Sequence, residues 1–570
     1  MMELTLTRIF SKYFFFLFLI AFSSNLTSQS FDPVRSKNGM VVSASKIASQ
    51  IGIDILKKGG NAIDAAVAVG FALSVSYPSA GNIGGGVFMV IHLQDGSNTT
   101  LDFRETAPKT VNEFIYQDSI GNFIPEKSQF GVTSSGVPGS VAGLLYALEK
   151  YGTMSLDEVI QPAIDLARNG FSLEFRLVKS FEYELENFNK YSSTKKIFTK
   201  DGFPFVENDL FIQTDLANTL DRIKESGFDG FYKGKTADLI IQQIKTDGGY
   251  ISKEDLVNYK TIERTPISTM YKGFQVFAPG PPSGGGVTLL QMLNVLENFS
   301  FKKEEWGSSK YIHHLVETMK YAFADRSKHI GDPAFYNVPL DWLLSKKYAK
   351  EISDKFDSLA TPSANILPGE EYSVQESEET THYSIIDKYG NAVSTTTTIN
   401  SSYGSKVVVD GAGFLLNNEM DDFSSKPGVP NQFGLIGNEA NKIEPGKRML
   451  SSMSPTIILK DGKPFMVIGS PGGSTISTVV LQVILNVIEF NMNIQQAIDK
   501  SKIHHQWFPD IIDYEAFGLS EDVIASLRSL GYTVGNERSL GRCEGILVDQ
   551  ENQIYFGATD PRGFGAAVGY

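Results

Sequence analysis

The stretch that begins at Thr380 constrains the fold of this chain more than any other part of it. Residues Thr381–Asp387 are rich in β-branched and aromatic side chains, and Ala392–Ile399 is almost wholly Ala, Val, Ser, Thr and Ile. Such compositions favour strands. Between them, Lys388-Tyr389-Gly390 fits a three-residue hairpin loop in which the glycine is left-handed. The sequence therefore predicts a β-hairpin.

The loop decides which residues face one another across this hairpin. It pairs Asp387 with Asn391, so Thr380 lies opposite Thr398 at the open end. Two facing threonines can simply tie two strands together, and the hairpin alone leaves that interpretation open. A threonine hydroxyl is a poor nucleophile without a base. Once the threonine is the first residue of a chain, its own α-amine can act as that base. A free α-amine titrates at about 7.7–8.0, so a cut between Glu379 and Thr380 would create a nucleophile with its base.

Short motifs accompany the hairpin in a fixed order along the chain. They are GGNAIDAAVA, NIGGGVFMV, DFRETAP, TTHYS, LLNNEMDDFS, PGVPNQFGLIG, LSSMSPT, GSPGGS and DPRGFGAAVGY. In order and spacing the chain resembles the gamma-glutamyltranspeptidase family over essentially its whole mature length. The resemblance implies an Ntn-hydrolase, which is a precursor that cuts itself and leaves a nucleophile at the new N-terminus. It also implies a division into residues 1–28 as signal peptide, 29–379 as large subunit and 380–570 as small subunit.

The order of predicted elements indicates a layered α+β fold. Helical patterns fill residues 140–264, strands cluster around the hairpin, and an apolar helix is predicted within residues 475–490. The family's fold, a four-layer αββα sandwich with two stacked and mainly antiparallel sheets, agrees with this order. The Gly84-Gly85-Gly86 run could be a phosphate loop, but no Lys-Ser/Thr follows it. We expect close backbone packing there instead.

The resemblance assigns catalytic roles by motif. It makes Thr380 the nucleophile, and Thr398 would hold its hydroxyl. Gly472 and Gly473 would form the oxyanion hole, since glycines before a helix let backbone N–H groups approach a reacting carbonyl. Without the family, a purely structural glycine turn is an equal alternative.

A gamma-glutamyl group presents an α-carboxylate and an α-ammonium at one end. The fork of Arg104 suits the carboxylate. The other residues that the resemblance implies for this end are hydroxyl donors to the carboxylate, Ser451 and Ser452, and acceptors for the ammonium, Asn400, Glu419 and Asp422. We interpret the remaining polar residues of the NNEMDD run, Asn417, Asn418 and Asp421, as a solvated turn. Pro427–Gly437 resembles a lid loop with Phe433 where a tyrosine is familiar, so lid latching is expected to be weaker.

Charge and metal-ligand patterns exclude several classes of function. A net charge of -14 argues against nucleic acid or an anionic membrane as partner. Neither CxxC nor HExxH occurs, and the adjacent pairs His313-His314 and His504-His505 are poor chelates. We therefore predict no metal and no cofactor. The single cysteine, Cys543, excludes a disulfide within the chain.

The first residues indicate export. A short apolar run, Tyr13–Phe22, follows Arg8 and Lys12, which is typical of a signal peptide. Cleavage is predicted after Ser28, with Ser23 as the alternative, and the protein would reach the periplasm or the medium. A retained N-terminal anchor is the competing interpretation.

The predicted function is that of a self-cleaving enzyme. It would remove the gamma-glutamyl group from glutathione and related amides and pass it to water, amino acids or peptides, with two fragments forming a heterodimer. One alternative is a cephalosporin acylase, whose glutaryl substrate lacks the α-amine; Glu419 and Asp422 argue for the amine. The other is a catalytically silent binding protein on the same scaffold, against which the complete set of site residues argues.

Overall fold

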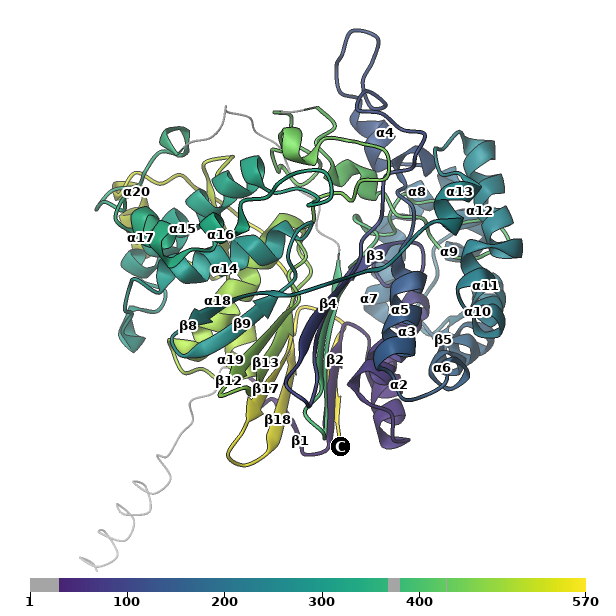
Figure 1. The fold of residues 1–570 in the computed structure, drawn as a ribbon, viewed down its shortest axis with the longest axis horizontal. Helices are drawn as coiled ribbons and strands as arrows, with labels where there is room; N and C mark the ends of the chain where they lie inside the picture. The colour runs from purple at the N-terminus through teal and green to yellow at the C-terminus, as the bar shows by residue number, and fades with distance from the viewer. Residues whose placement is uncertain (1–29, 367–379, 427) are drawn as a thin grey trace, which may run out of the picture. The chain divides into compact units, whose positions relative to one another are not determined.

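Two seven-stranded antiparallel sheets lie face to face at the centre of the molecule (Figure 1). The computed structural model describes residues 30–366, 380–426 and 428–570, and Pro33–Tyr570 form one unit. Sheet I has the order β1 (Val34–Ser36), β18 (Ile554–Thr559), β17 (Glu544–Asp549), β13 (Lys463–Gly469), β12 (Thr456–Lys460), β9 (Phe274–Ala278) and β8 (Ile267–Tyr271). Sheet II has the order β19 (Ala566–Gly569), β2 (Gly39–Ser43), β10 (Thr381–Asp387), β11 (Ala392–Thr398), β3 (Gly86–His92), β4 (Asn98–Phe103) and β7 (Ile262–Arg264).

Both faces of each sheet are buried, and successive residues of a strand point alternately to one face and the other. In β2, Met40 and Val42 point into the core between the sheets, where they meet Val467 and Ile546 of sheet I, whereas Val41 points to the helices behind. This alternation is what a strand covered on both sides requires. The two sheets therefore form the inner layers of a sandwich.

Helices form the two outer layers (Figure 1). Those packed on sheet II are α2 (Lys46–Lys57), α3 (Ala62–Ser76) and α5 (Ser140–Tyr151), and α6 (Leu156–Asn169) packs on α3. Those packed on sheet I are α14 (Gly284–Leu296), α18 (Ile476–Ile488) and α19 (Ile494–Asp499), and α15 (Ser309–His329) packs on α14. The predicted four-layer αββα architecture is thus confirmed.

Smaller elements complete the described chain. The helices are α4 (Pro125–Gln129), α7 (Phe175–Tyr183), α8 (Leu185–Lys190), α9 (Ser192–Phe198), α10 (Thr214–Ser226), α11 (Phe228–Tyr232), α12 (Gly234–Asp247), α13 (Lys253–Val257), α16 (Leu340–Leu343), α17 (Lys346–Ser353) and α20 (Glu521–Ser529). The short strands are β5 (Phe171–Ser172), β6 (Leu210–Phe211), β14 (Ile503–His504), β15 (Ile512–Tyr514) and β16 (Val534–Glu537). Within the described residues, no helix combines the length and apolar character needed to cross a membrane.

The predicted hairpin is confirmed in its loop and register. The Asp387 N–H donates to the Asn391 carbonyl at 3.1 Å, and Gly390 has a φ of +93°. Strands β10 and β11 pair Thr381 with Thr397, so Thr380 enters the sheet beside the end of β11 at Thr398.

The hairpin lies between strands from the first part of the chain. Strand β10 pairs with β2 and β11 pairs with β3, while the last strand, β19, covers the other side of β2. Sheet II therefore contains strands from both sides of residue 379, and strands of one segment lie between strands of the other. The predicted signal peptide, Glu379 and Pro427 lie outside the described residues.

Candidate active site

A buried asparagine holds the open end of the hairpin in place. The Asn82 side-chain nitrogen donates to the Thr398 carbonyl at 2.9 Å, and its oxygen accepts from Gly85 N–H at 2.8 Å. A Cβ on Gly85 would lie 2.2 Å from the Thr398 carbonyl oxygen. The glycine run thus serves close backbone packing, as expected. Thr380 and Thr398 are 5% and 4% exposed, which keeps this end of the hairpin away from bulk water.

The predicted oxyanion glycines lie just before α18. Gly472 and Gly473 have φ values of +136° and +53°, a region that side chains rarely adopt. Gly473 opens a 3₁₀ turn that leads into the helix, so its backbone sits at the positive end of the helix dipole. At Gly469, the last residue of β13 directly before this loop, a Cβ would lie 2.3 Å from the ring of His382, two residues after Thr380. This contact brings the glycine loop to the hairpin.

Arg104 lies at the centre of a buried cluster of carboxylates. Its Nη1 is 2.5 Å from Glu419 Oε2 and 3.4 Å from Glu105 Oε2, and its Nη2 pairs with Asp422. The side chains of Arg104, Glu105 and Glu419 are fully buried, whereas that of Asp422 is 12% exposed. Asp422 is therefore the member of the cluster that solvent can reach.

Burial controls how this cluster titrates. Burial raises the pKa of Glu105 to about 8, against the opposing effect of Arg104, and it raises the pKa values of Glu419 and Asp422 in the same way. Burial alone lowers the pKa of Arg104, but the surrounding carboxylates outweigh it and raise the pKa above its usual value. The arginine is therefore a permanent cation in a region with an excess of acids.

The LSSMSP segment is held by the proline- and glycine-rich loop before α14. Ser451 N–H donates to the Pro282 carbonyl at 2.9 Å, and the Ser451 carbonyl accepts from Gly285 N–H at 3.0 Å. A Cβ on Gly285 would lie 1.9 Å from the Ser452 carbonyl oxygen, so only glycine permits this approach. The Arg104 guanidinium lies 3.4 Å from the Leu450 carbonyl, one residue before Ser451. The two serines thus lie beside the arginine, as the prediction requires.

Asn400 connects the nucleophile end to the acidic segment. It has a φ of +78°, its N–H donates to Thr398 Oγ1 at 2.7 Å, and its side-chain nitrogen donates to the Asn418 carbonyl at 2.9 Å. With the nitrogen engaged, the amide oxygen is the group available to an ammonium. The catalytic and substrate-binding roles of all these residues remain predictions.

The expectation of a solvated turn in the NNEMDD run was wrong. Asn417, Asn418 and Asp421 are fully buried. Asn417 donates to the carbonyls of Gly84 and Gly136 and accepts from Gly136 N–H, at 2.8–2.9 Å. Buried backbone groups need partners, and this side chain supplies them for two loops that are remote in sequence.

The described part of the lid loop folds back on the site. Gly428 N–H donates to the Gly437 carbonyl, and the Gln432 N–H donates to Asp421 Oδ2 at 2.9 Å. Phe433 is 4% exposed, and a Cβ on Gly473 would lie 2.7 Å from its ring. The aromatic residue of the lid therefore packs on the predicted oxyanion glycine.

Sequence reasoning missed two charged residues of this site. Glu105 follows Arg104 directly, and its place in the same motif was a usable signal. Arg326 comes from α15, is 5% exposed, and donates to Ser452 Oγ at 3.1 Å. No local pattern indicates Arg326, because 126 residues separate it from its partner.

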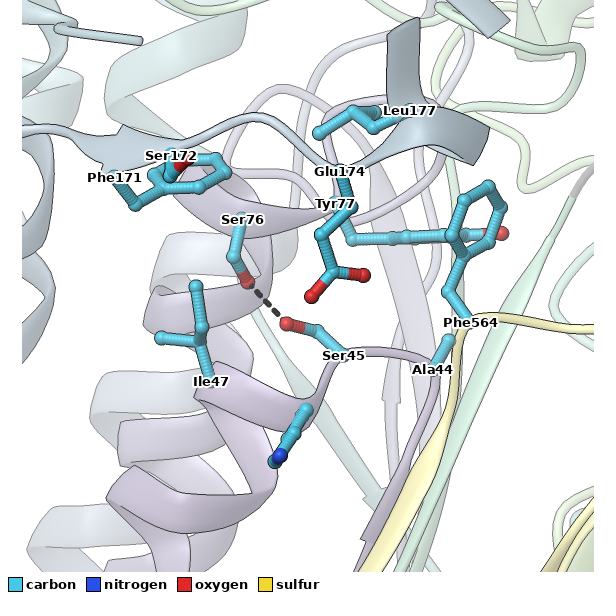
Figure 2. A pocket seen from close by; sticks show the side chains of 11 residues that line it. Ala44, Ser45, Ile47, Ser76, Tyr77, Phe171, Ser172, Glu174, Leu177 and Phe564 are labelled. Atoms are coloured by element: carbon cyan, nitrogen blue, oxygen red, sulfur yellow. Dashed lines mark hydrogen bonds between the residues drawn. The ribbon is translucent and has the colours of Figure 1, made fainter. Parts of the chain in front are cut away.

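Other polar features lie away from this site. Figure 2 shows a pocket at the start of α2, where the hydroxyls of Ser45 and Ser76 lie 2.8 Å apart and the Glu174 carboxylate points inward. Its lining includes Phe564 of the last motif and, within the described chain, none of the predicted site residues. The His313 ring bonds Tyr532 and the Asp357 carbonyl, and His505 pairs with Asp510. Among the described residues, no group of three or more metal-ligating side chains is found.

The fold consists of two stacked antiparallel sheets between layers of helices. A buried threonine, Thr380, lies where β10 begins and β11 ends. This arrangement defines the class of N-terminal nucleophile hydrolases. The sequence model of gamma-glutamyltranspeptidase matches residues 48–570. Glutathione hydrolase proenzyme of Escherichia coli strain K12 is 48% identical over 534 residues, 93% of this chain and 92% of that protein. The corresponding proenzyme of Pseudomonas sp. strain A14 is 46% identical over 557 residues, 96% of each chain. The chain belongs to the gamma-glutamyltranspeptidase family.

Solved structures agree with this assignment. The structure is similar to the crystal structure of cephalosporin acylase from Bacillus halodurans, with a TM-score of 0.85, 28% identity, and coverage of 96% of this chain and 98% of that one. It is also similar to Helicobacter pylori gamma-glutamyltranspeptidase, with a TM-score of 0.57, 45% identity, and coverage of 60% and 97%. The fold is thus shared by enzymes with two kinds of acyl donor.

Proposed function

We propose that this enzyme removes the gamma-glutamyl group from glutathione and other gamma-glutamyl amides and passes it to water or to the amine of an amino acid or peptide. The observation that carries the proposal is the buried cluster around Arg104, which holds both signs of charge within a few ångströms. A gamma-glutamyl group carries a carboxylate and an ammonium on one carbon, and the cluster offers a counter-charge for each.

The first reaction is the cut that produces the enzyme. In the precursor the Thr380 nitrogen is an amide and cannot act as a base. Its hydroxyl attacks the Glu379 carbonyl, the C–N bond breaks as the nitrogen takes up the proton, and an ester joins Glu379 to Thr380 Oγ1. Water hydrolyses this ester and frees the α-amine. The products are the proposed large subunit ending at Glu379 and small subunit 380–570.

Each later turnover uses that amine as the base. It takes the proton of the Thr380 hydroxyl as the oxygen attacks the substrate's γ-carbonyl, while the N–H groups of Gly472 and Gly473 stabilise the oxyanion. The amine then protonates the departing amino group, leaving a gamma-glutamyl ester on the threonine. Attack by water or by an acceptor amine releases the product and restores the hydroxyl.

Substrate binding exchanges one set of ion pairs for another. Without substrate, Glu419 and Asp422 neutralise Arg104. An incoming zwitterion supplies a carboxylate for the arginine and an ammonium for the acids, so the net charge of the site does not change. A glutaryl donor lacks the ammonium and would add a negative charge to a site that already has an excess of acids. This favours a gamma-glutamyl donor over the glutaryl donor of a cephalosporin acylase.

The proposed setting is outside the cytoplasm. The leader would be removed after Ser28 and the enzyme would act in the periplasm or the medium as a heterodimer of the two subunits. The sequence pattern of residues 8–28 supports export, and determining the N-terminus of the mature protein tests it.

Matched anilide donors test the proposed activity. We expect rapid release of the anilide from a gamma-glutamyl donor, acceleration by a dipeptide acceptor, and little release from a glutaryl donor. Glutathione should be hydrolysed by the same preparation. Preference for the glutaryl donor would overturn the assignment in favour of an acylase, and inactivity on both donors would favour a silent binding protein.

A further inference from the structure

Arg326 is a second buried guanidinium at the substrate-binding end of the site. Its Nη2 donates to Ser452 Oγ at 3.1 Å, and its Nε has no hydrogen-bond partner. Among the described residues no carboxylate lies within ion-pair distance of it. Buried cations are almost always paired, so this arginine lacks the anion that its burial calls for.

The residues around Arg326 do not supply that anion. The adjacent Asp325 is engaged elsewhere, since its carboxylate accepts from Gln291 at 2.5 Å and from the Tyr348 hydroxyl at 2.9 Å. Burial lowers the pKa of Arg326 to about 10, and the charge of Asp422 opposes this shift. The guanidinium therefore stays charged near neutral pH and is attracted by the same acid that pairs with Arg104.

The contact with Arg326 determines how the Ser452 hydroxyl is used. A guanidinium has donors only, so the serine oxygen must accept, and its single hydrogen points elsewhere. Ser451 is arranged similarly, because its oxygen accepts from the Met453 N–H at 3.2 Å. Both hydroxyls are thus held as donors, which a carboxylate requires. Ser452 is only partly buried, so a ligand can reach it.

We propose that Arg326 is a positioning residue for the α-carboxylate of the donor substrate. It acts through Ser452, whose hydroxyl it holds in the donor orientation, and it places a positive charge behind that hydroxyl. Arg104 contacts the carboxylate directly. Arg326 instead holds Ser452, whose hydroxyl contacts the carboxylate from the opposite side. The inference rests on the proposed gamma-glutamyl specificity and extends it to a residue on α15.

Two donors that differ only in the α-carboxylate test this role. Gamma-glutamyl anilide has the carboxylate and 4-aminobutyryl anilide lacks it. Arg326→Met should raise KM for the gamma-glutamyl donor by at least about tenfold, the size expected for a hydrogen bond to a charged group. It should leave kcat/KM for the 4-aminobutyryl donor unchanged, and Arg326→Lys should restore part of the loss.

A double variant separates positioning from general support of the fold. On a Ser452→Ala background, Arg326→Met should have little further effect, because the hydroxyl that it orients is gone. Equal losses on both donors, additive effects of the two substitutions, or no effect at all would each overturn the proposal. If Arg326→Met does not mature into two fragments, Arg326→Lys gives the same comparison.

Failure of the broader functional proposal would look different. The wild-type enzyme would then show no preference for the gamma-glutamyl over the 4-aminobutyryl donor, before any variant is compared. A clear wild-type preference with no selective effect of Arg326 variants would refute only the role of this arginine.

Discussion

The β10–β11 hairpin and the segment Asn417–Asp422 meet at one site, but their structures have different causes. The hairpin's register follows from strand composition and one left-handed glycine, so Thr381 faces Thr397 as expected. The segment is a short 3₁₀ turn whose polar side chains bond loops hundreds of residues away. Local pattern thus places the predicted nucleophile, whereas long-range contacts build the segment that is predicted to recognise the substrate.

This difference separates chemistry from stability. Changes at the end of the hairpin should abolish reaction with little effect on folding. Changes in the acidic segment should affect folding and binding together, because its side chains hold both backbone and charges. The predictions below test that separation.

The largest effect is expected at Thr380. Thr380→Ala removes the hydroxyl needed for both the cut and turnover, so we expect one uncut band and no measurable activity. Thr381→Val is a matched control, because the neighbouring buried hydroxyl has no hydrogen-bond partner. That variant should mature and retain activity. N-terminal sequencing of the wild-type small fragment must give Thr380, and any other start defeats the mechanism.

Asn417→Ala should show that the acidic segment is structural. The substitution removes the side-chain partners of the buried carbonyl and N–H of Gly136, and we expect a loss of about 3 kcal/mol in the free energy of unfolding. Asn552→Ala is the control, since that side chain bonds Asp549 in an exposed turn. Denaturant unfolding of both variants, carried out before any kinetic assay, measures their free energies of unfolding. Equal stabilities would restore the solvated-turn interpretation.

Arg104→Lys should weaken donor binding. Lysine keeps the charge but loses the fork that contacts Glu419 and Asp422, so binding should weaken by roughly 1.5–3 kcal/mol. Steady-state kinetics on the gamma-glutamyl donor measure this as a higher KM. Arg168→Lys, in an exposed ion pair with Asp221, serves as control. Unchanged kinetics of Arg104→Lys would remove this arginine from the site.

Asp421 should make stability depend on pH. Burial raises its pKa to about 6, above the value of about 3.9 in an unfolded chain. Its stabilising contribution is therefore complete below about pH 4 and is lost as the pH rises through about 6. Asp421→Asn removes this loss, so the variant should gain about 2 kcal/mol relative to wild type between pH 4 and pH 7. Urea unfolding at several pH values measures it, and parallel curves would contradict it.

The smallest effect is expected at the lid. Phe433→Ala removes the ring that packs on Gly473, so bulky donors should react a few-fold faster while the cut before Thr380 is unaffected. Phe517→Ala, at a fully exposed phenylalanine, is the control. Kinetics on small and bulky donors measure the change. Identical ratios for the variant and wild type would make the segment an ordinary surface loop.

What could be predicted from sequence follows the same division. The register that sets Thr381 opposite Thr397 was predictable because the pattern of the two strands is local, and the glycines before α18 were visible as a turn. Asn417 was misjudged because a polar run carries no sign of burial until its distant partners are known. Arg326 was missed because it reaches Ser452 only when α15 packs on α14 in the folded chain.

The strand order of sheet II has a consequence for the two fragments that the proposed cut would produce. Strands β10, β11 and β19 belong to the segment after residue 379, and β2 and β3 belong to the segment before it. Separating the fragments would break the backbone ladder on both sides of β2 and between β11 and β3. The two pieces are therefore not partners in a reversible equilibrium. Activity per molecule should survive extreme dilution, and differently tagged preparations should not trade fragments when mixed.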